Sequence, residues 1–176
     1  MRLFIAVNFN GAVIEQILEI QERLRAQSLR GNFTRPENFH LTLAFLGETP
    51  EDKADDLRRI IKEIKTGPFE LTFDRAGCFT HSGKKLWWIG TAPDCPGLSL
   101  LNTIHRQLLE DLLDAGFPAD TRPFSAHITL GREIKNSGDV ILAPPEIVVM
   151  VDRISLMQSE HIQGKLTYTE LFGTQL

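Results

Sequence analysis

The chain has 176 residues, a length that suits one domain with a substantial core or two small lobes that share a core. Apolar residues make up 42% of it and charged residues 24%, which is ordinary for a globular protein in water. The formal net charge is −4, so we do not expect a surface that grips long nucleic acid by neutralising many phosphates, whereas a nucleotide end or a short strand is compatible with this charge.

Alternating strands and helices are predicted along the whole chain. Apolar residues with a period of two indicate strands, and those at helical spacing indicate amphipathic helices. In chain order the predicted elements are a strand over 2–9, a helix over 11–28, a short extended piece over 32–34, a strand over 40–47, a helix over 49–64, a strand over 69–74, a loop over 78–85, a strand over 85–91, a helix over 97–115, a strand over 127–132, a loop over 133–139, and strands over 146–157 and 165–172. Thr49 as N-cap with Pro50 at the first helical position gives the second helix a strong start.

The order of these elements predicts an α+β fold. Strands joined by hairpins form antiparallel sheets, and helices cover one face of such sheets. We therefore expect a single bilobal domain over residues 1–176, with helices on the outside. The uncovered faces of the two sheets would look at each other across a central cleft.

One sequence pattern, Arg-Pro-x-x-x-His-apolar-Thr-Leu, occurs twice, over residues 35–43 and 122–130. A single His-x-Thr would mean little, but two copies with the same flanking residues are seldom expected by chance. Arg35 and Arg122 either reach the cleft or fix the turn before each strand. The repeat indicates that the two halves of the chain contribute alike to one site.

Each copy of the pattern displays an imidazole and a hydroxyl on one face of a strand. Because side chains alternate along a strand, His40 and Thr42 share a face, as do His127 and Thr129, with apolar residues behind them. Histidine titrates near pH 6.5, so one copy can accept a proton while the other donates one. In-line displacement at phosphorus uses such a pair, with the threonine hydroxyls as donors to the phosphoryl oxygens.

The motifs resemble those of a known superfamily. His40-Leu41-Thr42-Leu43 and His127-Ile128-Thr129-Leu130, with the segments 35–39 and 45–47 around the first, are similar to the 2H phosphoesterases, and most similar to their RNA 2′,3′-cyclic phosphodiesterase family, also called 2′-5′ RNA ligases. The resemblance covers the whole chain in length and element order. It implies a bilobal fold with a pseudo-twofold cleft, no metal or cofactor, and opening of a 2′,3′-cyclic phosphate at an RNA end to leave a 2′-phosphate, with reversible 2′-5′ ligation as a further possible activity.

The resemblance also implies roles for individual residues. His40 corresponds to the proton donor to the departing 3′ oxygen, and His127 to the proton acceptor that activates water. Thr42 and Thr129 would bind the non-bridging oxygens, and Arg132 would be a further phosphate ligand.

Two positions depart from the family pattern, and at one of them we expect the strand to bend or end. Ala126 stands where the family often has proline, and Gly131 where it often has alanine. Strict alternation would aim Arg132 away from Thr129, so we predict that Gly131 bends or ends the strand.

Weaker candidates lie elsewhere in the chain. Trp87 and Trp88 are adjacent and should point to opposite faces, so one could stack on a base, although core packing is the preferred interpretation. Phe45 falls on the face of Leu41 and is expected in the core. His81, His105 and His161 are expected at structural or solvent-facing positions. Lys84 and Lys85 are expected at a solvated hairpin tip rather than in a role that steers RNA to the cleft.

The expected partners are RNA ends or nucleotides that carry a 2′,3′-cyclic phosphate. No apolar run is long enough for a signal peptide or a membrane span. Cys78 and Cys95 fit no disulfide framework, which favours a cytoplasmic protein. We also expect a monomer. Two alternatives stay open: a module that binds RNA ends or nucleotides with little turnover, and a histidine metal site. The second is disfavoured because no third ligand stands at a suitable spacing.

Overall fold

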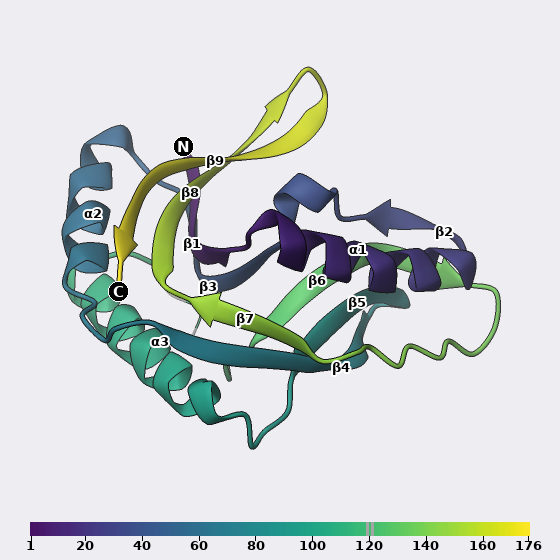
Figure 1. The fold of residues 1–176 in the computed structure, drawn as a ribbon. Helices are drawn as coiled ribbons and strands as arrows, with labels where there is room; N and C mark the ends of the chain where they lie inside the picture. The colour runs from purple at the N-terminus through teal and green to yellow at the C-terminus, as the bar shows by residue number, and fades with distance from the viewer. Residues whose placement is uncertain (119, 121) are drawn as a thin grey trace.

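The computed structural model describes residues 1–118, 120 and 122–176 (Figure 1). The strands in this part of the chain are β1 (Arg2–Asn8), β2 (Ser28–Phe33), β3 (His40–Glu48), β4 (Phe69–His81), β5 (Lys84–Thr91), β6 (His127–Asn136), β7 (Ile147–Val151), β8 (Arg153–Ile162) and β9 (Lys165–Gln175). The helices are α1 (Gly11–Ala26), α2 (Ala54–Lys62) and α3 (Pro96–Asp114), with 3₁₀ turns η1 (Pro36–Asn38) and η2 (Glu51–Lys53). None of the described helices is both long and apolar enough to cross a bilayer.

All the strand pairs are antiparallel, in the order β7-β4-β5-β6-β3-β1-β8-β9, with β2 paired to β6. We call β1, β3, β8 and β9 the first lobe, and β2 and β4 to β7 the second lobe. The lobes join at one residue pair between β3 and β6. The predicted α+β fold with antiparallel sheets is confirmed, and the pseudo-twofold relation between the lobes stays a prediction.

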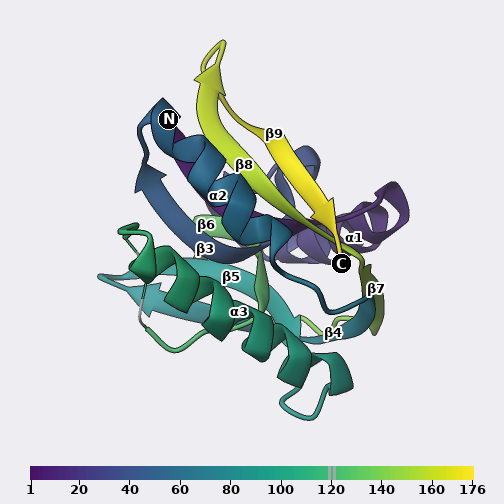
Figure 2. The same cartoon turned by 90° about the vertical axis from the view of Figure 1, so that its left-hand side faces the viewer.

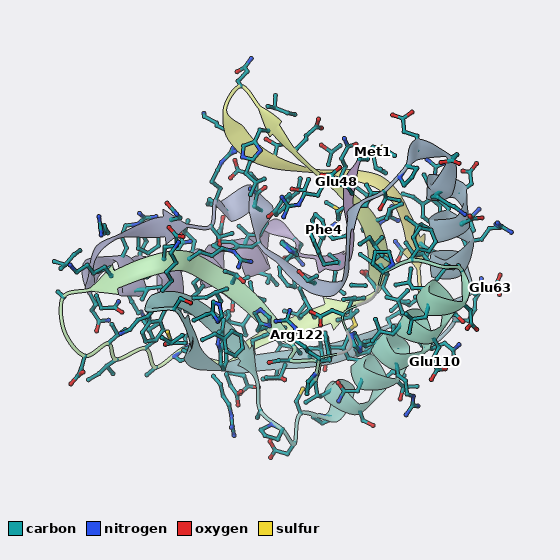
Figure 3. All side chains as sticks on the ribbon, turned by 180° about the vertical axis from the view of Figure 1, so that it is seen from behind. Met1, Phe4, Glu48, Glu63, Glu110 and Arg122 are labelled. Carbon is teal, nitrogen blue, oxygen red and sulfur yellow. The ribbon has the colours of Figure 1, made fainter. Side chains whose placement is uncertain are left out.

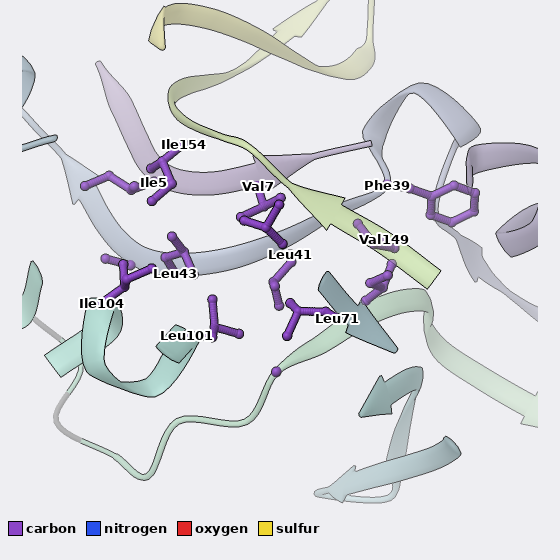
Figure 4. Packing of buried hydrophobic residues seen from close by; sticks show 14 of the residues in the cluster. Ile5, Val7, Phe39, Leu41, Leu43, Leu71, Leu101, Ile104, Val149 and Ile154 are labelled. Carbon is purple, nitrogen blue, oxygen red and sulfur yellow. The ribbon is translucent and has the colours of Figure 1, made fainter. Parts of the chain in front are cut away.

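The helices lie on the outside of this arrangement (Figures 1 and 2). α1 packs on β6 and β7, α2 on β8 and β9, and α3 on β4 and β3, with α2 and α3 side by side. The main core joins buried residues of both lobes, as Figure 4 shows for Ile5, Leu43, Leu71, Leu101 and Val149.

The predicted start of the second helix is wrong. Thr49 is buried and its hydroxyl donates to Gly47 O at 3.3 Å, while its backbone N–H donates to Met1 O at 2.7 Å, so it belongs to the end of the sheet. Figure 3 shows Met1 and Glu48 together at this end. η2 follows, and α2 begins only at Ala54.

The hairpins are longer than predicted. The loop expected over 78–85 is mostly strand, because β4 and β5 pair up to a two-residue turn at Ser82 and Gly83, which have φ values of 49° and 74°. Two consecutive positive φ angles are typical of the tight turn that joins antiparallel strands. Gln163 and Gly164 make the same kind of turn between β8 and β9.

Two further boundaries differ from the prediction. The strand expected over 146–157 is divided at Asp152, because β7 pairs with β4 of the second lobe and β8 pairs with β1 of the first. The loop expected over 133–139 begins as strand, since β6 continues to Asn136 by pairing with β2. Both boundaries depend on distant pairing partners.

Candidate active site

The two motif strands meet at a single residue pair, Leu41 opposite Ile128. Both side chains are 0% exposed and lie in the core. The residues that flank this pair on each strand must therefore point to the other face of the sheet, away from the core. These flanking residues are the two histidines and two threonines of the repeat.

The antiparallel register brings the two motifs together. In an antiparallel pair the residue before Leu41 faces the residue after Ile128, so this register directs His40 toward Thr129 and Thr42 toward His127. Each imidazole is thus directed toward the hydroxyl of the other lobe. The electrostatics agree, because the positive charge of His127 lowers the pKa of His40, although less than burial does.

Both imidazoles are held by the same backbone contact. Nδ1 of His40 lies 2.7 Å from Asn38 O, and Nδ1 of His127 lies 2.8 Å from Ser125 O. A carbonyl oxygen only accepts, so each Nδ1 carries the proton and each neutral ring presents its Nε2 lone pair to the site. Thr42 Oγ1 lies 2.9 Å from His40 Nε2 and donates to it. Within the described residues, Nε2 of His127 has no hydrogen-bond partner.

Burial sets the protonation state of the two histidines. It is the main reason why the pKa of His40 and that of His127 lie below the ordinary value, and the charge of Arg132 lowers both further. The hydrogen bonds to the backbone carbonyls act in the opposite direction. Both rings are therefore neutral at pH 7 in the free protein, and a bound anion would raise both pKa values.

Phe45 lies on the site face, so its predicted place in the core is wrong. Leu43 and Ala44 are both buried, because the pairing with β1 skips Leu43 in a β-bulge. The bulge shifts the alternation by one residue. Phe45 is consequently 47% exposed and on the same face as His40.

An equivalent bulge in β6 places Arg132. Leu130 and Gly131 are both buried, and the pairing with β5 skips Leu130, so Arg132 returns to the face of Thr129. The predicted bend is confirmed, although the strand does not end there. A Cβ atom on Gly131 would lie 2.8 Å from Ile134 Cδ1 and 3.3 Å from Asn32 O, so an alanine here would require the end of the Ile134 side chain to shift. Phe45 lies five residues after His40, and Arg132 lies five residues after His127. The first motif thus supplies an aromatic ring to the site face, and the second motif supplies a guanidinium at the equivalent position.

A pocket of about 420 Å³ opens beside His40. Its lining includes Arg2, Phe4, Thr42, Phe45, Arg132 and Tyr168, so both lobes contribute. The rings of Phe4 and Tyr168 have their centroids 4.9 Å and 5.2 Å from that of His40. The prediction missed this lining, although Arg2 and Phe4 alternate along β1 with Leu3 and Ile5 of the main core and so could have been assigned to the site face.

Two aromatic side chains surround His127 as well. The centroid of Phe79 lies 5.4 Å from that of His127 and the centroid of Trp88 lies 6.4 Å from it. Trp87 points the other way, packs against the core and donates from Nε1 to Asn136 Oδ1 at 3.2 Å, as the predicted opposite faces require. Phe79 escaped prediction because it lies in the segment expected to be a loop.

The two arginines that open the repeated pattern lie outside the pocket. Arg122 is exposed and paired with Asp120, whose pKa it lowers to about 2. Arg35 pairs with Glu37. Neither arginine lines the pocket beside His40, so both belong to the turns that precede the motif strands.

The remaining histidines lie at the edge of the site or outside it. His105 stacks on Phe124 with centroids 4.0 Å apart. His81 and His161 are exposed, as predicted, but His161 also lines the pocket. No three His, Cys, Asp or Glu side chains of the described chain gather as a metal site would require.

Comparisons with known proteins identify relatives of this chain. The family model described as LigT like phosphoesterase matches residues 7–88. An RNA 2′,3′-cyclic phosphodiesterase of Escherichia coli K12 is 32% identical over 97% of this chain and 93% of its own, and that of Archaeoglobus fulgidus is 33% identical over 80% of this chain and 77% of its own.

Solved structures show the same fold. E. coli LigT complexed with 3′-AMP has a TM-score of 0.84 to this chain at 29% identity and covers 99% of this chain and 97% of its own. The protein TT0787 of Thermus thermophilus has a TM-score of 0.85 at 26% identity and covers 100% and 98%. The relationship thus extends over the whole chain in both sequence and structure. The chain belongs to the LigT-like phosphoesterase family of the 2H superfamily.

Proposed function

We propose that this protein hydrolyses the 2′,3′-cyclic phosphate at an RNA end to a 2′-phosphate. The observation that carries the proposal is the single Leu41–Ile128 pair, which brings two imidazoles and two hydroxyls from different lobes onto one face. The names of its relatives as RNA 2′,3′-cyclic phosphodiesterases support the same substrate class.

His127 acts as the proton acceptor in this scheme. Its Nε2 has a free lone pair, because Nδ1 is protonated and held by Ser125 O. The ring takes a proton from water as the water oxygen bonds to phosphorus. Burial favours the neutral form that this step needs.

His40 acts as the proton donor. The bond between phosphorus and the 3′ oxygen breaks, and the oxygen takes a proton from Nε2 of the imidazolium, so the product carries a 2′-phosphate and a 3′-hydroxyl. Because burial disfavours the imidazolium, the negative charge of the bound phosphate is needed to raise the pKa of His40 before the reaction. Protonation also frees the Thr42 hydroxyl from Nε2.

The remaining side chains of the site stabilise charge. Thr42 and Thr129 donate to the non-bridging oxygens, and Arg132, on the same face, balances their charge as it builds up in the transition state. The 5′-hydroxyl of a second RNA in place of water would give 2′-5′ ligation by the same proton transfers, which is the reversible activity we predict. We expect a location in the cytoplasm, where cysteines stay reduced, as the two described cysteines are. We also expect a monomer.

Product analysis tests the proposal. An oligonucleotide that ends in a 2′,3′-cyclic phosphate should yield a 2′-phosphate, separable by chromatography from the 3′-phosphate isomer. A 3′-phosphate would reverse the leaving group. Tight binding of the oligonucleotide without turnover would favour the alternative, a binding module for RNA ends.

A further inference from the structure

A second groove, of about 670 Å³, lies in the second lobe between the tip of the β4–β5 hairpin and the paired strands β2 and β6. The charged residues that line it are four bases and one acid: Arg30, Lys84, Lys85, Lys135 and Glu133. The whole chain has a net charge of −4, so this local excess of positive charge is opposite in sign to the chain as a whole. A basic groove on an acidic protein indicates an anionic partner.

The charges of the groove are only partly neutralised by the protein. Glu133 is committed to Lys84, at 2.5 Å from its Nζ. Arg30 lies directly opposite Lys135 across the β2–β6 pair, and in the described chain neither takes part in an ion pair. Like charges that face each other across strands destabilise a sheet. A bound anion would remove this repulsion.

The groove adjoins the candidate active site. Asn32, which lines the groove, is paired across the strands with Arg132, which lines the pocket beside His40. From Arg132 to Lys135 is three residues along β6, or about 10 Å at the usual rise of a strand. A nucleic acid strand advances about 3.4 Å per nucleotide when stacked, so phosphates within a few nucleotides of the reacting one reach the groove.

We propose that this groove binds the backbone phosphates of single-stranded RNA upstream of the cyclic end. The proposal rests on the proposed function and deepens it, because the substrate then is an oligonucleotide rather than a mononucleotide. Arg30 and Lys135 contact phosphates, and Lys85, which donates to Asn136 Oδ1 at 3.4 Å, lies beside them. Such contacts carry no base specificity.

The test compares two substrates and two variants. The groove variant is Arg30→Gln/Lys135→Gln, and the matched control is Lys65→Gln/Arg106→Gln, which removes one Lys and one Arg from exposed positions near the helices. Each is assayed on a 2′,3′-cyclic mononucleotide and on a hexanucleotide with a 2′,3′-cyclic end.

The groove variant should raise KM for the hexanucleotide at least about fivefold and leave KM for the mononucleotide within about twofold. The dependence of log KM on log salt should become shallower by about 0.7 for each phosphate that the variant no longer neutralises. The control should change none of these values. Equal effects on both substrates, or no effect on the hexanucleotide, would overturn the proposal.

A direct binding measurement separates this proposal from the proposed function. If the wild type hydrolyses neither substrate, the proposed function fails. The groove can still be tested, because fluorescence anisotropy measures the affinity of the protein for a 5′-labelled hexanucleotide that carries a 3′-phosphate. At low salt the groove variant should bind it at least about fivefold more weakly than the control variant. Equal affinities of the two variants would overturn the groove assignment.

Discussion

Replacing His40 by Ala tests how the proton-transfer roles are assigned. Its Nδ1 is bound to Asn38 O, so only Nε2 can serve the substrate. General acid catalysis contributes about 10² to 10⁴ in rate, so kcat should fall by that factor, equivalent to about 2.7–5.4 kcal/mol. His127→Ala should cost a similar factor, because its Nε2 is the only nitrogen of that ring open to the site.

A substrate analogue separates the two roles. With sulfur in place of the 3′ oxygen, the departing group is a thiolate, which needs little protonation because thiols are far more acidic than alcohols (the cysteine thiol has a pKa near 8.5). His40→Ala should then come within about tenfold of the wild type, whereas His127→Ala should keep its full defect, because water must still lose a proton. Equal defects, or rescue of His127→Ala instead, would refute the assignment. The exposed His81→Ala serves as the control, and thermal unfolding checks that each variant is folded.

The remaining predictions concern pH, charge and the pocket. The pH profile of kcat/KM reports the free enzyme, and it should be bell-shaped with a maximum below pH 6.5 because burial lowers the pKa of both His40 and His127. The profile of kcat should have its maximum at higher pH, because the bound phosphate raises both pKa values. A kcat/KM maximum above pH 7 would contradict the pairing of His40 and His127. Arg132→Gln should lower kcat/KM about 10²-fold or more, whereas Arg122→Gln, which removes an exposed surface charge, should leave it within about twofold. Phe45→Ala should raise KM for a cyclic mononucleotide by about tenfold if a base stacks there, with Phe45→Tyr near normal; equal KM values for both would exclude stacking. Turnover should survive a strong chelator, and its loss, with restoration by a divalent metal, would instead support a metal site.

The essential part of the site could be predicted because it depends on local alternation. His40 and Thr42 must share a strand face whatever the strand pairs with, and the same holds for His127 and Thr129. The repeat then indicates that the two pairs belong together, and the structure joins them by the register Leu41 to Ile128.

The residues that the prediction misplaced depend on partners far away in the chain. Phe45 reaches the site because β3 skips one residue against β1, and no local pattern specifies a bulge. The break at Asp152 arises because β7 and β8 pair in different lobes, and the β-branched and apolar residues that continue past Asp152 give no sign of this change of partner. Phe79 lies in a polar hairpin, which has no apolar stripe that would predict a strand. The strand forms there because of the backbone hydrogen bonds between β4 and β5.

A crystal structure of the protein with a nucleoside 2′,3′-vanadate, which mimics a five-coordinate phosphorus, tests most directly whether two imidazoles from separate lobes act on one phosphate. We predict that Nε2 of His40 lies within about 3.2 Å of the apical 3′ oxygen and Nε2 of His127 within the same distance of the opposite apical oxygen. A complex in which only one ring reaches the vanadium ligands, or in which both rings lie on one side of it, would contradict the mechanism.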